Sequence, residues 1–258
     1  SINMGTDSVF VYRSGAGNIN NLAGTALMMN GSDNIGYYTI NGGSVTNDGI
    51  ITGTAGKNNV AIYNTGGGIV NNGTVAVGDS EIAYEKDHLG NYIYDVNGNK
   101  ILDAENSKYA VGLYGESSVV TNSISGSISV GEGSIGIATK GGSSTNDGII
   151  TGTGESTRGM YTEKGIIINN NTINITGDNS IGMAGNGAGS TVINNGTVTV
   201  TGKNVIGLYG NLATTIINSG TVISNGEGAQ GIVLSQGSKL DNTVSGTLII
   251  NSVRTGNY

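Results

Sequence analysis

Cysteine, proline and tryptophan are absent from the 258 residues of this chain, and phenylalanine occurs once. Without cysteine, the fold relies on neither disulfide bonds nor thiolate metal sites. Without proline, nearly every residue keeps a backbone N–H donor, which suits a chain whose N–H groups belong to β-ladders. We therefore expect an all-β protein that has no covalent crosslink and no cofactor.

Charged side chains are also scarce, at 11% of residues, and the formal net charge is −7. A negatively charged chain has no electrostatic attraction to the phosphates of nucleic acid or to anionic lipid. Nothing in the sequence resembles a transmembrane helix. These absences predict that the chain binds no nucleic acid and makes no direct contact with a membrane.

Glycine, by contrast, is abundant, with 47 residues, and it recurs within a repeated unit of about 24 residues. The unit is clearest from Asn194 to Gly210, where the sequence reads NNGTVTVTGKNVIGLYG. Repeats of this length cannot bury an apolar face alone, so they must stack and share one continuous core. A column of asparagines keeps the same spacing, with one jump between the third and fourth members: Asn21, Asn47, Asn71, Asn122, Asn146, Asn169, Asn194, Asn218 and Asn242.

Each unit is predicted to form three short β-strands, because apolar and polar residues alternate over four or five positions and then give way to turn residues. In the first strand, Val198 and Val200 share one face. In the second strand, the same alternation predicts that Ile206 and Leu208 both point into the core. In the third strand, Val192 lies two residues before Asn194, so a period of two turns the asparagine inward as well.

A buried primary amide costs free energy unless its donors and acceptors are used. Parallel, in-register stacking supplies an identical amide above and below each one. The asparagine column therefore predicts a right-handed parallel β-helix, a solenoid of about ten coils near 24 residues each, with residues 1–258 as a single domain. Because the chain starts and stops within a repeat, we expect a fragment of a longer solenoid. The alternative for the asparagines is a channel for a polar ligand.

Between Ile82 and Val111 the equivalent strand positions are 29 residues apart, which places an insertion at residues 83–108. It contains an Asn-Gly pair between strand-forming residues, the strongest short-range signal of a β-hairpin. Residues 79–105 hold seven of the 18 acidic residues and the single histidine. Insertions in solenoids project from one face and often carry the binding function. The predicted partner-binding residues are therefore His88, Tyr92, Tyr94, Asp95, Asn97, Asn99 and Tyr114.

The insertion also places oxygen-bearing side chains at alternate positions, as a calcium-binding loop does, at Asp95, Asn97 and Asn99. However, Lys100 stands where an EF-hand loop needs glycine, and Asn106 stands where it needs a bidentate glutamate. The single histidine has no cysteine or second histidine with which to share a metal. We therefore predict a plain hairpin turn and no metal site.

A further column, of tyrosines, is predicted to point outward from the second strand. Stacked aromatic rings on a β surface are suited to hold a sugar ring or the side chains of a partner. The other interpretation is that the rings shield the strand glycines beside them. The members of this column are Tyr12, Tyr38, Tyr63, Tyr114, Tyr161 and Tyr209.

Catalysis on acidic polysaccharides, which many parallel β-helix proteins perform, requires clustered carboxylates and usually a metal or a basic residue. The acidic residues on the coils of this chain are instead solitary and lie at turns, where capping of the backbone is their ordinary function. We therefore predict that the chain is not an enzyme. These solitary residues are Asp48, Asp147, Asp178 and Asp241.

The repeat units resemble the passenger regions of type V autotransporter adhesins. The resemblance is carried by Asn-Asn-Gly-Thr-Val at 71–75 and 194–198, and by Thr-Asn-Asp-Gly-Ile-Ile-Thr-Gly-Thr at 46–54 and 145–153. The low-proline, Asn-Gly-Thr style is most like that of the large outer-membrane autotransporters of fusobacteria. The resemblance covers nearly the whole chain except the insertion.

This resemblance implies export through a C-terminal membrane β-barrel, which this fragment lacks, and display on the cell surface at the outer membrane. It also implies attachment to host cells, through a surface receptor or glycan, or to other bacteria. We therefore predict a surface-displayed adhesin passenger in which a rigid β-helical stalk presents exposed loops. The alternatives are a polysaccharide-degrading β-helix enzyme and a spacer without a ligand.

Overall fold

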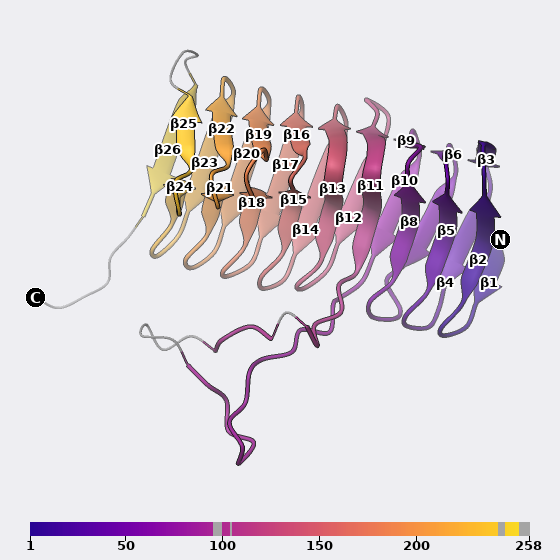
Figure 1. The fold of residues 1–258 in the computed structure, drawn as a ribbon, viewed down its shortest axis with the longest axis horizontal. Helices are drawn as coiled ribbons and strands as arrows, with labels where there is room; N and C mark the ends of the chain where they lie inside the picture. The colour runs from indigo at the N-terminus through magenta and orange to yellow at the C-terminus, as the bar shows by residue number, and fades with distance from the viewer. Residues whose placement is uncertain (95–99, 104, 242–245, 253–258) are drawn as a thin grey trace, which may run out of the picture.

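The computed structural model describes residues 1–94, 100–103, 105–241 and 246–252 of the chain. Throughout these residues the structure is all-β and has no helix, and parallel strands stack coil upon coil into a β-solenoid (Figure 1). About ten turns follow one another, and paired residues of successive coils lie about 24 positions apart. The predicted fold class is confirmed. Among the described residues, no helix is long and apolar enough to cross a membrane.

The first strands of successive coils form one face of the rod, a parallel sheet of ten strands. In order along the rod, these strands are β1 (Ile2–Met4), β4 (Ala26–Met29), β7 (Ile50–Gly53), β10 (Thr74–Val77), β12 (Ser127–Val130), β14 (Ile149–Thr153), β17 (Thr172–Thr176), β20 (Thr197–Thr201), β23 (Thr221–Asn225) and β26 (Thr247–Asn251).

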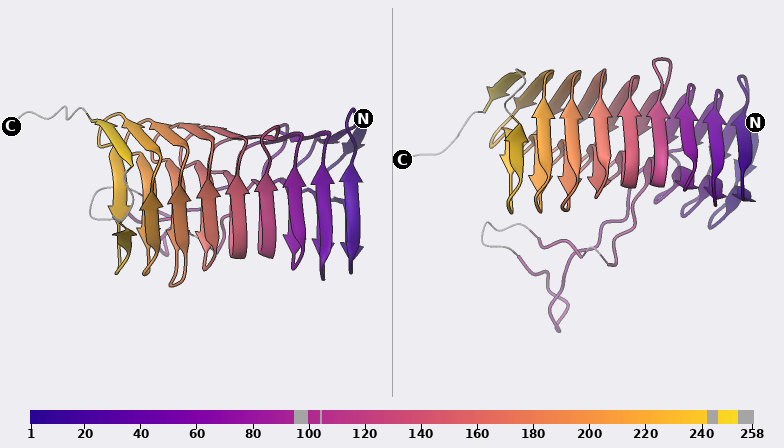
Figure 2. Two further views of the ribbon diagram at one scale, coloured as in Figure 1. Left: turned by 90° about the horizontal axis from the view of Figure 1, so that it is seen from above. Right: turned by 45° about the horizontal axis from the view of Figure 1, so that its top comes forward.

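The second and third strands of the coils belong to a single sheet of 16 strands, which wraps around the rest of the rod (Figure 2). The second face consists of β2 (Val9–Ser14), β5 (Ile35–Ile40), β8 (Val60–Thr65), β11 (Val111–Asn122), β13 (Ile135–Asn146), β15 (Arg158–Glu163), β18 (Ile181–Asn186), β21 (Ile206–Asn211) and β24 (Gln230–Leu234). The third face consists of β3 (Gly17–Asn21), β6 (Gly43–Asn47), β9 (Gly68–Asn71), β16 (Ile166–Asn169), β19 (Thr191–Asn194), β22 (Thr215–Asn218) and β25 (Lys239–Asp241).

Two strands join these faces into one sheet. β11 and β13 are each 12 residues long and continue from the second face into the third without a break. β11 consequently pairs with β8 through its first half and with β9 through its second half. The prediction of three separate strands per coil therefore holds for the coils on either side, whereas these two central coils have two strands each.

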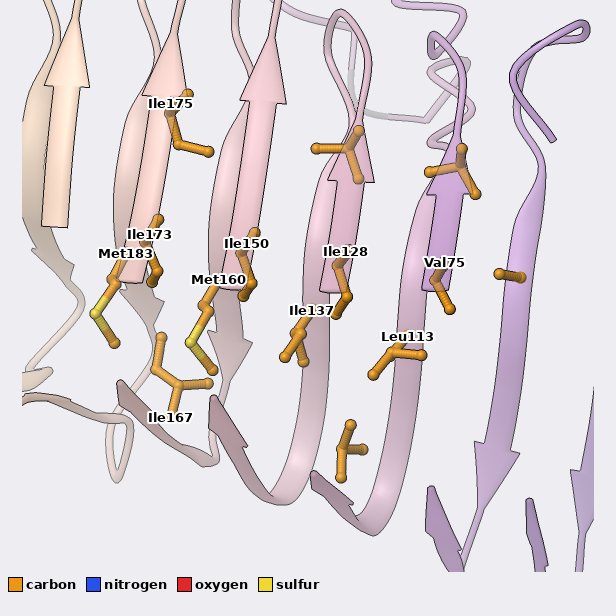
Figure 3. Close-up of a cluster of buried hydrophobic side chains, with 14 of the residues drawn as sticks. Val75, Leu113, Ile128, Ile137, Ile150, Met160, Ile167, Ile173, Ile175 and Met183 are labelled. Atoms are coloured by element: carbon orange, nitrogen blue, oxygen red, sulfur yellow. The ribbon is translucent and has the colours of Figure 1, made fainter. Parts of the chain in front are cut away.

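Rows of apolar side chains from successive coils fill the interior of the rod (Figure 3). Ile128, Ile150 and Ile173 occupy equivalent positions on the first face, and each is at most 1% exposed. Burying a side chain of this size contributes about 1.5–3 kcal/mol relative to leaving it in water. Each coil contacts mainly the coils before and after it, so the core is continuous along the rod.

The second face departs from simple alternation at its glycine column, which consists of Gly112, Gly136, Gly159, Gly182, Gly207 and Gly231. Leu208 is fully buried, but Ile206 is only half-buried, and the equivalent position two coils earlier holds Arg158. Gly207 between them also faces inward, where an added Cβ would lie 2.2 Å from Cγ1 of Val222. The prediction that Ile206 and Leu208 both point into the core is therefore wrong, because the strand bends and turns two consecutive positions inward.

Candidate ligand site between the insertion and the rod

The asparagine column lies inside the rod, and its amides bond to one another. From Asn21 to Asn194, the Nδ2 of each member donates to the Oδ1 of the asparagine in the next coil over 2.6 to 2.9 Å. Several amides also donate to a backbone carbonyl, as Asn194 does to Thr221 over 3.2 Å. Among the described members, these hydrogen-bonding groups are thus used within the rod, which leaves none of them free for a polar ligand channel. The described members are Asn21, Asn47, Asn71, Asn122, Asn146, Asn169, Asn194 and Asn218, and Asn242 lies outside the described residues.

The tyrosine column lies on the outside of the second face. The ring centroids of Tyr38 and Tyr63 are 4.8 Å apart, and those of Tyr63 and Tyr114 are 4.6 Å apart with nearly parallel planes. The neighbouring glycines, Gly112 and Gly115, point the other way, because a Cβ on them would meet the core residues beneath. The rings therefore pack on each other and do not shield these glycines. Tyr114 belongs to this rod surface and not to the insertion.

The insertion leaves the rod after β10 and returns at β11, and its two ends are joined. The backbone N–H of Glu81 donates to the carbonyl of Lys108 over 3.0 Å, and the N–H of Lys108 donates back over 2.9 Å. The Lys108 ammonium also lies 3.1 Å from Oδ1 of Asp33 on an earlier turn of the rod. From this stem the insertion runs along the rod beside the turns of the following coils (Figure 1).

Within the insertion, three short segments hydrogen-bond in a closed cycle. The N–H of Glu85 donates to Ile101, that of Ile101 donates to Ile93, and that of Ile93 donates to Glu85, over 2.8 to 3.0 Å. Antiparallel bridges join 84 with 102, 86 with 92, and 94 with 100. The insertion is therefore a closed unit of three segments, which is more than the single predicted hairpin.

Aspartates cap two turns of the insertion, one between the first and second segments and one after the third. Oδ1 of Asp87 accepts the backbone N–H groups of Leu89 and Asn91, each over 2.9 Å. These hydrogen bonds, that of Asn91 first, hold the pKa of Asp87 below its usual value. Oδ1 of Asp103 accepts the N–H of Asn106 over 3.1 Å in the same way. Turn capping thus uses both carboxylates.

The predicted calcium-like positions Asp95, Asn97 and Asn99 lie outside the described residues. Elsewhere in the described chain, no group of three histidine, cysteine, aspartate or glutamate side chains is arranged to hold a metal ion. His88 is exposed in the turn that the Gly90 N–H closes by donating to the Asp87 carbonyl over 3.0 Å.

Tyrosine rings and lysines form a cluster on the insertion. The rings of Tyr84 and Tyr92 meet edge to face at 6.2 Å. The ammonium of Lys100 lies 4.0 Å from the Tyr92 centroid and 5.2 Å from the Tyr84 centroid, and that of Lys86 lies 5.1 Å from the Tyr92 centroid. Such cation–π contacts hold a lysine over an aromatic face without neutralising its charge.

A cavity of about 550 Å³ lies between this cluster and the turns of the rod. Its insertion wall includes Tyr84, Tyr94 and Lys100, which face the rod wall. The rod wall includes Glu155, Arg158 and Asn179 from the turns and edge between the first and second faces. Oε1 of Glu155 accepts the side-chain N–H of Asn179 over 2.8 Å. Burial, with the nearby carboxylates of Glu155 and Glu132, raises the pKa of Tyr84, so its hydroxyl stays protonated.

The structure thus brings only part of the predicted set together. Tyr94 lines the cavity, and Tyr92 contacts the lining residue Lys100. His88 and Tyr114 are not among the residues that line the cavity. Tyr109 connects the two aromatic surfaces, because it lines the cavity and also packs in the outer apolar cluster with Tyr114.

Tyr94 is the one lining residue that was predicted; those that the prediction missed include Tyr84, Lys100, Glu155 and Arg158. A signal for the insertion was present in the sequence, since the pattern Asp-x-x-Gly-Asn occurs at 87–91 and again eight residues later at 95–99. This short repeat, with a third aspartate at 103, matches the three-segment cycle. Nothing in the sequence pairs the insertion with the rod residues of the opposite wall.

Comparison with models of protein families, with curated proteins and with solved structures finds no match to this chain. The fold defines the class as a parallel β-solenoid with one folded insertion. A solenoid is compatible with several functions, so a function must be argued from the site that it carries.

Proposed function

We propose that this chain is part of a surface-displayed adhesin passenger, a rigid β-solenoid stalk that attaches to host cells or to other bacteria through its insertion. The observation that carries this proposal is the cavity of about 550 Å³ between the insertion and the rod. Its insertion wall is aromatic and charged. The interior of the rod, in contrast, is filled by apolar rows and by amides that bond to one another.

Display at the cell surface, after export through a C-terminal membrane β-barrel, is part of the proposal. It is supported by the resemblance of the Asn-Gly-Thr repeat units to type V autotransporter passengers. The stacked coils supply stiffness, because every coil is hydrogen-bonded to the next along most of its length. The partner is a host surface receptor or glycan, or a bacterial surface, and the net charge of −7 disfavours nucleic acid.

We further propose that the chain is not an enzyme. Hydrolysis of a glycosidic bond uses two carboxyl groups placed about 5–10 Å apart. Among the described residues, the cavity wall contributes one carboxylate, Glu155, and that group is bonded to Asn179. Incubation with acidic and neutral polysaccharides should therefore produce no new reducing or unsaturated ends.

Removal of the insertion tests the attachment role. Glu81 and Lys108 form a doubly hydrogen-bonded antiparallel pair, which is the geometry that flanks a two-residue hairpin turn. Replacing residues 82–107 by Asn-Gly should therefore close the stem and leave the circular dichroism spectrum and the melting temperature of the rod nearly unchanged. Binding of the chain to host cells and to partner bacteria should be lost.

The control is Glu105→Gln, which alters an exposed residue of the insertion away from the cavity lining and should retain attachment. Undiminished attachment after removal of the insertion would contradict the proposal. Failure of the wild-type chain to attach to any cell would favour the ligand-free spacer.

A further inference from the structure

We infer that the cavity between the insertion and the rod is a binding site for a sugar that carries a carboxylate. This inference rests on the proposed attachment function and gives the chemical class of its ligand. The site is composite: Tyr84, Tyr94 and Lys100 come from the insertion, and Arg158, Glu155 and Asn179 come from the rod. Neither wall alone encloses a ligand.

Two cations on opposite walls select a negative group. Among the described residues, Lys100 and Arg158 form no ion pair, whereas Lys108, Lys140 and Lys203 each do. The guanidinium of Arg158 presents parallel N–H donors that match the two oxygens of a carboxylate, and the ammonium of Lys100 adds a point charge from the other side.

The remaining polar groups suit the hydroxyls of a sugar. The Glu155 carboxylate accepts hydrogen bonds and the Asn179 amide both donates and accepts, and the two are held in place by their mutual bond of 2.8 Å. The hydroxyl of Tyr84 stays protonated and so remains a donor. The faces of the tyrosine rings are apolar and flat, and they suit the C–H face of a sugar ring.

Size and shape favour a sugar over a peptide. The volume of about 550 Å³ lies within the roughly 300–1,000 Å³ of small-molecule sites. An extended peptide is usually recognised by an open sheet edge or a long groove with apolar side-chain pockets. This cavity is instead bounded by two walls, and the rod beside it presents turns and not a free strand edge.

The test compares two sugars that differ in one group. Methyl α-D-galacturonoside carries a carboxylate where methyl α-D-galactoside carries a hydroxymethyl group. Titration of each into the full chain, followed by saturation-transfer NMR and calorimetry, should show binding of the galacturonoside at least about tenfold tighter than that of the galactoside.

Matched substitutions locate the binding. Arg158→Gln and Lys100→Gln should each weaken galacturonoside binding by about tenfold or more, and should bring it close to that of the galactoside. Arg13→Gln on β2 and Lys57→Gln, in the turn between β7 and β8, remove the same charges away from the cavity and should have no effect. Lys100 lies outside every strand of the rod, so its variant remains informative even if Arg158→Gln alters folding.

Equal binding of the two sugars, binding of neither, or retention of galacturonoside binding in Lys100→Gln would overturn the inference. Stronger binding of a short aspartate-rich peptide than of the galacturonoside would also overturn it. A further outcome separates failure of the carboxylate site from failure of the proposed attachment function. If removal of the insertion abolishes attachment but Arg158→Gln and Lys100→Gln still attach fully, the insertion mediates attachment and the carboxylate site does not.

Discussion

At the scale of single residues, two adjacent asparagines show how burial decides how much an amide–amide hydrogen bond contributes to stability. Asn194 bonds to Asn169 and Asn218 in the coils on either side, over 2.9 and 2.8 Å, and is fully buried. Asn195 bonds to Asn170 and Ser219 in the same coils, over 2.9 and 3.2 Å, and is exposed. The outer amides lose little if a bond breaks, because water replaces it. The inner amides have no such replacement.

Asn194→Ala should therefore lower the free energy of unfolding by about 2–5 kcal/mol, because it leaves the amides of Asn169 and Asn218 without their partners in the core. Asn195→Ala should change it by no more than about 1 kcal/mol. Urea denaturation followed by circular dichroism measures both. Equal losses for the two variants would show that the buried column has no special value.

The hydroxyl of Tyr63 connects stability to alkaline pH. It donates to Oε2 of Glu116 over 3.2 Å, and burial first, then the neighbouring Tyr114, raises its pKa to about 12. An unfolded tyrosine has a pKa of about 10. Because the folded pKa is the higher one, the contribution is complete below pH 10 and is lost as the pH rises from about 10 to about 12.

We expect the urea midpoint of the wild-type chain to fall between pH 10 and 12 more steeply than that of Tyr63→Phe, which has no proton to lose. Tyrosines that are not in contact with Tyr63 are common to both proteins and cancel in the difference. Denaturation at pH 8, 10, 11 and 12 provides the comparison. Parallel declines in the two proteins would mean that Tyr63 titrates in the same way in the folded and unfolded chains.

At the scale of elements, the bend in the strands of the second face sets which side chains reach the surface. On β21, simple alternation would point Gly207 outward, but it faces the core. The preceding residue, Ile206, therefore lies toward the outside. The same bend on β15 places Arg158 at the cavity and not in the core. Close approach of coils at the glycine column is therefore a condition for the candidate site.

Gly207→Ala tests this close approach. The new Cβ would lie 2.2 Å from Cγ1 of Val222 and 2.6 Å from the carbonyl of Gly231, so we expect a loss of about 1–3 kcal/mol from overpacking. Gly68 on β9 is the control, because a Cβ there meets nothing closer than 3.5 Å. Gly68→Ala should be neutral or stabilise by up to about 1 kcal/mol. Thermal unfolding of both variants gives the answer, and equal stability of the two would show that the coils yield at Gly207.

At the scale of the whole molecule, the sequence was sufficient to predict the solenoid, since one residue column repeated every 24 or so positions reports on every coil. The asparagine column from Asn21 to Asn218 follows from that spacing alone. It continues even across the insertion, where Asn71 hydrogen-bonds to Asn122 over 2.7 Å. The outward position of Ile206 was not predictable from alternation, because the bend at Gly207 depends on contacts with the next coil.

The candidate site was the least predictable part. Tyr94 was identified from the composition of the insertion, but its cavity exists only because the insertion lies along coils that come later in the chain. Arg158 is 58 residues from Lys100 and carries no local pattern, so the sequence shows it as one isolated basic residue. The insertion does not share the 24-residue period of the rod, so packing between the two leaves no periodic pattern in the sequence from which to infer it.

The strands lie across the rod, so the hydrogen bonds between coils run along its length (Figure 1). A pull on the two ends therefore loads these bonds in tension, one coil at a time, and not all together in shear. Each coil that peels away releases about 24 residues, or about 80 Å of extended chain, in place of the ~4.8 Å that it occupied. If the rod is the stalk proposed above, it would lengthen stepwise under load and would limit the force that flowing liquid transmits to a partner bound at its far end.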